Sequence, residues 1–158
     1  MKTTQKILIT FVIIFSFAGS CSNDDDPPIT TNKTNCLIVG TWKFSGSTYY
    51  GVDVYNLPST SFEIGTNGQD IYGYETCYKD DVVIFTDNNA FIQDAGANKC
   101  NTTDPQTKTN AYFINANQTQ ITFNITNTPA FISEVLILNA TTLKINNGGE
   151  RTETFTRQ

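Results

Sequence analysis

The segment CYKDDVVIFTDNNAFIQDAGANKC, residues 77–100, contains two apolar runs separated by the turn-forming residues 87–89. This arrangement predicts an antiparallel β-hairpin. A three-residue loop with Asn89 in the left-handed region would pair Phe85 with Phe91 across the two strands. A two-residue loop is the alternative, and we favour the first register because it brings the two aromatic side chains opposite each other.

The same β-strand character continues through residues 36–158. Ile121, Phe123 and Ile125 alternate with polar residues, as expected of a strand with one buried face. The Asn-Asn-Gly-Gly segment at 146–149 predicts a turn between two further strands. Helical periodicity is hard to find, so we expect an all-β domain of roughly seven to nine short strands. A closed antiparallel up-and-down β-barrel and a β-sandwich both fit this pattern.

Residues 1–20 have the organisation of an export signal. Lys2 and Lys6 precede an apolar stretch over 7–18 that is too short to span a bilayer. The small residues before Cys21 resemble the lipobox of bacterial lipoproteins, although its usual branched aliphatic position is occupied here by alanine. This resemblance implies cleavage before Cys21 and acylation of that cysteine. An ordinary secretory signal with an incidental cysteine is the alternative.

Residues 21–35 form a predicted tether. The segment has almost no apolar residue, and Pro27 and Pro28 stiffen it. The acidic run 24–26 resembles the signal that sends some lipoproteins of Gram-negative bacteria to the outer face of the outer membrane; a solvated linker is the alternative. We therefore expect an outer-membrane lipoprotein that is attached through the lipid on Cys21 and faces the cell exterior. A location on the periplasmic face is the alternative.

The composition argues against nucleic-acid binding and against common catalytic machinery. The chain has 15 acidic and 10 basic residues, and cleavage of the signal would remove two lysines and no acid. A chain this acidic lacks the cations that phosphate binding requires. It also has no histidine, which excludes a Ser-His-Asp triad and the commonest metal ligand. We expect no nucleic-acid partner, no metal, no cofactor and no catalytic residues.

Asp80 and Asp81 are adjacent carboxylates within the predicted hairpin. Neighbouring residues of a strand point to opposite faces, so these two side chains are not expected to converge on one substrate. We interpret them as solvated residues at the start of the strand. An enzyme that uses other carboxylates, such as Asp53 or Glu63, is one functional option.

The hairpin also predicts a disulfide. In either register Cys77 and Cys100 lie within one residue of opposite each other, provided that the strands extend that far. In an oxidising compartment such a pair forms a disulfide, and closing a loop of this size stabilises the fold by about 3 kcal/mol. Cys36 then has three open interpretations: a buried free thiol, an intermolecular link, or the true partner of Cys77 or Cys100. Without histidine or Cys-x-x-Cys spacing, a zinc site is not expected.

Gly40 and Trp42, in the segment LIVGTWKF at 37–44, resemble the Gly-x-Trp signature of lipocalins. The resemblance implies an antiparallel up-and-down barrel of about eight strands in which Trp42 plugs the closed end. It also implies that a basic residue of the last strand lies across the indole. Arg157, on the same face as Phe155, occupies that place, and such cation–π stacking contributes about 0.5–2 kcal/mol.

Other segments are similar to the lipocalin-like domain of small bacterial surface lipoproteins. Those proteins share a Thr-Thr-Leu-Lys strand, here 141–144, and a closing strand such as Thr-Phe-Thr-Arg, here 154–157. They also share a Cys-x-Lys-Asp-Asp to Gly-x-x-Lys-Cys segment, which is matched here by Cys77, Lys79, Asp80, Asp81, Gly96, Lys99 and Cys100. The similarity spans most of 36–158 and departs from the family at Cys36 and in a longer segment at 49–78. It implies the barrel and transfers no binding residue.

Six of the seven tyrosines lie between residues 49 and 78. Tyrosine combines an apolar ring with a polar tip, which suits a binding surface. In a lipocalin-like barrel this segment would hold the first long loop and the second strand, near the open mouth; tyrosines that merely fill the barrel are the alternative. The candidate ligand-binding residues are Tyr49, Tyr50, Tyr55, Phe62, Tyr72, Tyr74, Phe44 and Phe123.

Two hypotheses about function follow. In the first, a small apolar molecule binds inside a hollow barrel lined by Phe44, Phe123, Ile125, Leu143 and some of the tyrosines. In the second, the barrel is filled by its own side chains, and an exposed tyrosine-rich surface binds a glycan or a protein. Both describe binding rather than catalysis.

Overall fold

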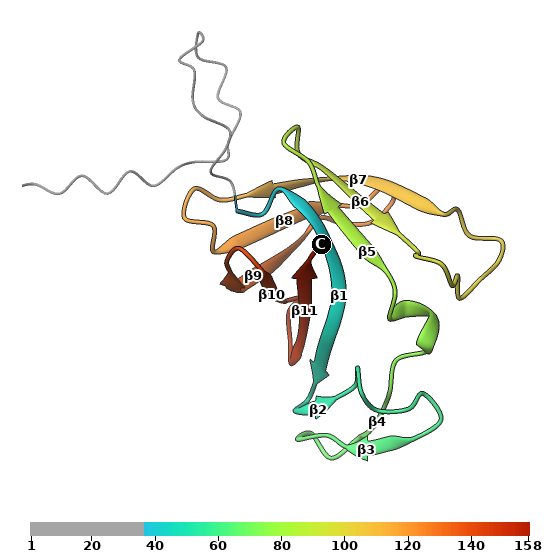
Figure 1. Ribbon diagram of the computed structural model, residues 1–158. Coiled ribbons are helices and arrows are strands. Elements are labelled where there is room, and N and C mark those ends of the chain that lie inside the picture. Colours follow the sequence, from blue (N-terminus) through green and yellow to red (C-terminus); the bar gives the residue numbers. More distant parts are fainter. Residues whose placement is uncertain (1–36) are drawn as a thin grey trace, which may run out of the picture.

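Eight antiparallel strands of the computed structural model, which describes residues 37–158, follow one another around a closed barrel (Figure 1). The last strand pairs with the first, so the barrel has no open seam. The predicted up-and-down barrel is confirmed, and the sandwich alternative is wrong. The barrel strands are β1 (Gly40–Tyr49), β5 (Val82–Phe85), β6 (Ala90–Asp94), β7 (Thr107–Ile114), β8 (Gln120–Asn124), β9 (Phe131–Leu138), β10 (Thr142–Asn146) and β11 (Arg151–Arg157).

The β5–β6 hairpin adopts the register predicted for a three-residue loop. Phe85 pairs with Phe91 and Ile84 with Ile92. Asn89 adopts a φ of 63°, in the left-handed region that the turn requires. The local pattern of apolar and turn residues was therefore sufficient to determine this pairing.

One end of the barrel is filled by its own side chains. Alternation along the strands directs large apolar residues inward at this end, and each of them is at most 1% exposed. They are Ile38, Trp42, Ile114, Ile121 and Leu143. We call this the closed end, and the opposite end, toward which β1 runs, the mouth.

The long segment between β1 and β5 does not contain the second barrel strand, contrary to the expectation for residues 49–78. It forms β2 (Val52–Asp53), which pairs with the end of β1, a separate hairpin of β3 (Phe62–Ile64) and β4 (Asp70–Tyr72), and a short 3₁₀ helix, η2 (Thr76–Tyr78). Glycine, proline and asparagine interrupt the segment too often for a long strand. Figure 1 shows these elements beyond the mouth end of β1.

This segment has a small hydrophobic core of its own. Val52, Val54 and Ile71 are buried there, and Tyr50 and Leu57 pack against them. The tyrosine-rich segment therefore lies at the mouth, as expected, but partly as a separate folded unit.

Several predictions concern residues outside the described part of the chain. The signal peptide over 1–20, the acylated Cys21, the tether over 21–35 and the role of Cys36 all lie there. Within 37–158, no helix has the length and apolar character needed to cross a bilayer.

The closed end is sealed by contacts between the first and last strands. The guanidinium carbon of Arg157 lies 4.1 Å from the centroid of the Trp42 ring. Arg157 also donates hydrogen bonds to the carbonyl oxygens of Val39, at 2.9 Å, and Leu37. The Trp42 indole N–H donates to the carbonyl of Ile38 at 2.7 Å. These bonds hold the guanidinium group and the indole in place and satisfy the buried indole N–H.

Gly40 is required by this arrangement. Its φ of 144° is one that L-residues rarely adopt, and a Cβ at this position would collide with Arg157 Nη1. Arg157 can move away only by losing its stacking on Trp42 and its two carbonyl bonds. The glycine of the Gly-x-Trp signature is therefore explained by the space that the arginine occupies.

We predict that Gly40→Ala lowers the free energy of unfolding by about 2–4 kcal/mol, measured by urea denaturation. Gly148→Ala is the matched control, because Gly148 also has a positive φ, of 90°, but a methyl group added there would have no neighbouring atom within 4 Å. This control should lose only the backbone cost of about 1 kcal/mol. Equal losses in the two variants would contradict the proposed role of the Arg157 contact.

Candidate functional site

The mouth half of the barrel contains a cavity of about 360 Å³. This volume lies within the range of small-molecule sites in proteins. Most of its wall is aromatic, and all barrel strands except β7 contribute to it or to its rim. The lining residues are Phe44, Tyr74, Tyr78, Asp81, Val83, Phe85, Phe91, Gln93, Phe123, Ile125, Phe131, Ile145, Asn147, Glu153 and Phe155.

Contacts between the rings hold one wall of the cavity. The Phe91 ring lies 5.1 Å from Phe85 and 4.9 Å from Phe123, and Phe123 stacks on Phe131 at 5.1 Å. Tilted and stacked contacts of this kind add stability beyond simple burial. The wall is therefore preorganised by neighbouring rings rather than by a ligand.

The cavity reaches solvent at the mouth. Two of its lining side chains, Tyr78 and Phe131, are 44% and 38% exposed. At the other end the cavity is limited by the packed closed end, where Trp42 and Leu143 have no exposed surface. A ligand would thus enter from the side of the tyrosine-rich segment.

A chain of polar contacts crosses the cavity rim. Arg151 Nη1 donates to the Tyr74 hydroxyl at 3.0 Å, and this hydroxyl lies 3.4 Å from Glu153 Oε1, to which it donates. Burial, followed by the negative charge of Glu153, raises the pKa of Tyr74. Tyr74 is therefore a neutral hydrogen-bonding group at neutral pH.

Asp81 is the second carboxylate of the cavity. Burial raises its pKa to about 6, and the neighbouring charges of Asp80 and Asp94 act in the same direction. The backbone of Asp81, just before β5, is held by its carbonyl oxygen, which accepts a hydrogen bond from the Phe44 amide at 3.0 Å. Asp81 and Phe44 both line the cavity.

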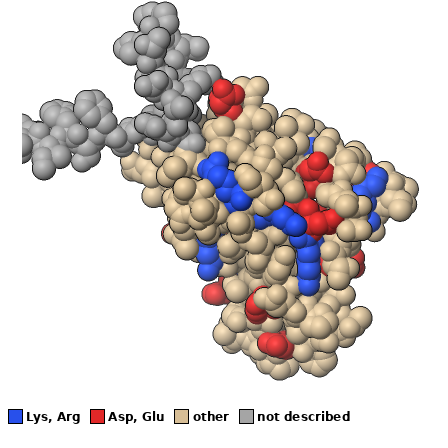
Figure 2. Space-filling view, viewed as in Figure 1, with Lys and Arg blue, Asp and Glu red and all other residues tan. Residues whose placement is uncertain are grey.

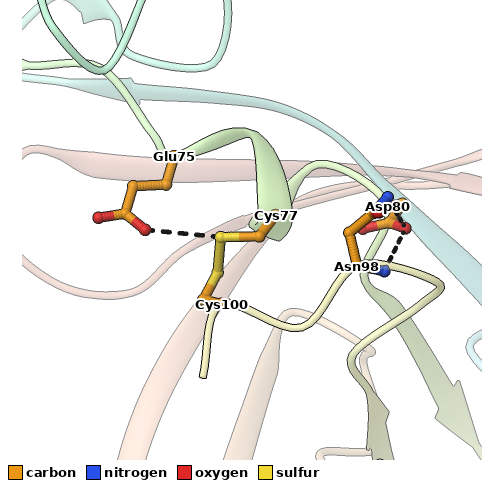
Figure 3. Close-up of a disulfide and its surroundings, with 5 residues drawn as sticks. All are labelled: Glu75, Cys77, Asp80, Asn98 and Cys100. Carbon is orange, nitrogen blue, oxygen red and sulfur yellow. Dashed lines mark hydrogen bonds between the residues drawn. A yellow bond between two sulfur atoms is a disulfide. The ribbon is translucent and has the colours of Figure 1, made fainter. Parts of the chain in front are cut away.

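Asp80 binds the loop after β6 and has a structural role. Its Oδ2 atom accepts hydrogen bonds from the backbone amides of Ala97 and Asn98, at 2.8 and 3.1 Å, and from the Asn98 side chain at 3.0 Å (Figure 3). The two carboxylates therefore do not converge. The expectation that both are solvated is wrong, because each is half-buried by the loops that pack around this end of β5.

A disulfide joins Cys77 in η2 to Cys100 in the loop after β6, with the Cα atoms 5.1 Å apart (Figure 3). The strands do not extend this far, since β5 begins at Val82 and β6 ends at Asp94. Glu75 Oε2 lies 3.5 Å from Cys77 Sγ. Because the sulfur atoms are bonded to each other, they are not free to ligate a metal ion together with this carboxylate.

The structure brings only some of the candidate ligand-binding residues to the cavity. Phe44, Phe123 and Tyr74 line it, whereas Tyr55 packs behind Phe44 at 5.1 Å. Leu143, which was expected in the cavity wall, belongs to the closed end.

The remaining candidates lie outside the cavity. Tyr49 and Tyr50 pack on each other at 4.6 Å, and Arg151 lies over the Tyr49 ring. Phe62 and Tyr72 lie on the β3–β4 hairpin and are 52% and 59% exposed.

Five polar residues of the cavity were not among the predicted site residues: Tyr78, Asp81, Gln93, Asn147 and Glu153. Glu153 shares a strand face with Phe155. For Asp81 the available signal was its position two residues before Val83, which faces the interior. Inward-facing polar residues at the open end of a barrel strand are the pattern that would have identified them.

Charged side chains on the outer surface are mixed. On the face shown in Figure 2, Lys and Arg side chains lie among Asp and Glu side chains and form no broad basic patch. On this face, the described part of the chain presents no surface typical of a nucleic-acid interface.

Comparison with known proteins identifies one family. A sequence model of the family described as lipocalin-like domain matches residues 38–145. Among solved structures, a lipocalin-like protein from Bacteroides uniformis is similar, with 12% sequence identity and a TM-score of 0.47, and the match covers 77% of this chain and 99% of that chain. No functionally curated protein gave a significant match.

We predict that Asp81→Asn stabilises the protein at neutral pH. The folded-state pKa of about 6 lies above the ordinary value of 3.8, so this group favours the folded state most at low pH and loses that contribution as the pH rises through 6. The variant should raise the free energy of unfolding by about 1 kcal/mol at pH 7.5, after allowance for partial solvation, and give no gain at pH 4.

Urea denaturation at the two pH values measures this difference. Asp80→Ala is the control: it should be destabilising at pH 7.5 by about 1–3 kcal/mol, because the loop amides lose their acceptor. Destabilisation by Asp81→Asn at pH 7.5 would contradict the assigned environment of Asp81.

Proposed function

The chain belongs to the lipocalin-like domain family, whose barrel supports a ligand-binding function, and on that basis we propose that it binds a small apolar molecule inside the barrel. The observation that supports this most directly is the aromatic-lined cavity of about 360 Å³ at the mouth. Burial of apolar ligand surface against these rings would contribute about 25 cal/mol per Å². The few polar groups of the rim would orient the ligand.

The proposed function is binding without catalysis. The sequence has no histidine, and the two carboxylates that an enzyme was expected to use lie outside the cavity. Asp53 is engaged by the Asn56 side chain at 2.7 Å, a hydrogen bond that lowers its pKa, and Glu63 is exposed on β3.

The proposed location is the outer membrane, with the protein attached through a lipid on Cys21 and facing the cell exterior; the periplasmic face is the alternative. The support comes from the lipobox-like sequence and the acidic run 24–26.

We predict that filling the cavity abolishes binding of an apolar probe. Ile125→Trp should raise the Kd of N-phenyl-1-naphthylamine at least tenfold in a fluorescence titration, because Ile125 lines the cavity and the indole would occupy part of it. Ile132→Trp is the matched control on the outer surface, where Ile132 is 58% exposed. The proposal fails if the wild type does not bind the probe or if the two variants behave alike.

An interaction module for glycans or proteins is the second candidate. The filled barrel that this hypothesis assumed is not observed, since the mouth half is hollow. The observation in its favour is the exposed apolar surface of the β3–β4 hairpin, where the Phe62 and Tyr72 rings lie 5.7 Å apart and Ile64 is 63% exposed. Exposed aromatic pairs of this kind are suited to stacking on a sugar or on an apolar side chain.

For this second candidate we predict glycan-array binding that depends on the hairpin. The F62S/Y72S variant should lose at least tenfold in array signal while its thermal midpoint and its N-phenyl-1-naphthylamine affinity stay unchanged. An array signal that is absent from the wild type, or equal in both proteins, would eliminate glycan binding at this surface.

A further inference from the structure

We propose that the cavity selects apolar molecules that carry a positively charged amine, because two carboxylates and a set of aromatic rings line it and no Lys or Arg side chain of residues 37–158 does. This inference rests on the proposed ligand-binding function and adds the chemical class of the ligand. The carboxylates are those of Asp81 and Glu153.

The two carboxylates stand on adjacent parts of the wall. Asp81 immediately precedes β5 and Glu153 lies on β11, and these strands pair with β1 from opposite sides. Phe44 of β1 connects them, since its amide bonds the Asp81 carbonyl and its partner Phe155 lies two residues after Glu153 on β11. Both acids therefore flank Phe44 at the mouth side of the barrel.

The negative charge of Asp81 has no ion-pair partner among residues 37–158, where the salt bridge of Lys108 is made to Asp104 instead, at 3.9 Å. The nearby groups Asp80 and Asp94 are themselves acidic and contribute to the raised pKa of Asp81, and Gln93 is neutral. A cation at this position would therefore relieve an unfavourable charge.

The cations of the neighbouring segments are engaged elsewhere. Lys79, two residues before Asp81, lies over the Tyr55 ring at 5.3 Å. Arg151 stacks on Tyr49 and donates to Tyr74, so it reaches Glu153 only through the Tyr74 hydroxyl. A groove outside the mouth shares Asp81 with the cavity and is also lined by Lys99 and Lys108. Lys99 donates to two backbone carbonyls, and Lys108 forms the salt bridge described above.

The aromatic wall favours the same ligand class. Ammonium groups are attracted to the faces of Phe and Tyr rings, with larger effects at sites shielded from water. A hydrogen bond between an ammonium group and a carboxylate is also stronger than one between neutral groups. A fatty acid would instead bring a further negative charge next to Asp81 and Glu153, so the same cavity should disfavour it.

Three ligands with the same eight-carbon chain test the proposal: octylamine, octanol and octanoate. Each is titrated against the wild-type protein with bound N-phenyl-1-naphthylamine at pH 7.5, and its displacement gives a relative Kd. We expect octylamine to bind at least tenfold more tightly than octanol and octanoate to bind most weakly. The preference for octylamine over octanol should decrease as the pH falls below about 6, where Asp81 becomes protonated while the alkylamine stays charged.

Variants test whether the carboxylates cause the preference for octylamine over octanol. Asp81→Asn should reduce the octylamine-to-octanol ratio toward one without changing the octanol Kd, and Glu153→Gln should reduce it to a smaller extent. Asp70→Asn, on the exposed edge of β4, is the charge-matched control and should leave the ratio unchanged. If Asp81→Asn does not fold, the pH profile of the wild type and the Glu153→Gln variant provide the same comparison.

The outcomes separate the two proposals. Binding of the probe and octanol without a preference for octylamine, or with a preference for octanoate, would overturn the amine inference and leave the apolar cavity intact. Failure of the probe and of all three ligands to bind would overturn the proposed function and the inference together.

Discussion

The stacking of Arg157 on Trp42 is the interaction on which the rest of the barrel depends. It joins the last strand to the first at the closed end, and its hydrogen bonds reach the carbonyl oxygens of the residues that precede β1. Without the pairing of β1 and β11, the barrel would expose two unpaired strand edges. The contact also explains Gly40, whose missing side chain leaves room for the guanidinium group.

The two halves of the barrel differ because their inward-facing residues differ. Near Trp42 the interior residues interdigitate completely, whereas at the mouth a ring of phenylalanines surrounds open space. Aromatic side chains are rigid, and their tilted and stacked contacts form a stable wall without filling the centre. The packed closed end stabilises the barrel, so the mouth half can remain hollow. The acidic groups at the rim make this cavity negatively charged.

Local patterns in the sequence predicted the features that depend on neighbours in the chain. The β5–β6 register followed from alternation and from the turn at Asn89, and the barrel followed from the resemblance around Trp42. The inward direction of Asp81 was not predicted, although alternation from Val83 indicates it. The hydrogen bonds that Asp80 accepts from Ala97 and Asn98 were not predictable, because they depend on how a loop distant in sequence packs against residue 80. The β3–β4 hairpin was missed because frequent turn residues obscured its short strands.

The pairing of β1 with β11 constrains the order in which the barrel can form. Trp42 pairs with Arg157, so both edges of β1 are paired only after β11 has been added to the sheet. Contacts this far apart in sequence form slowly, since the intervening chain must first be brought together. Without β11, one edge of β1 and one edge of β10 have no partner strand, so deletion of β11 would leave the barrel open.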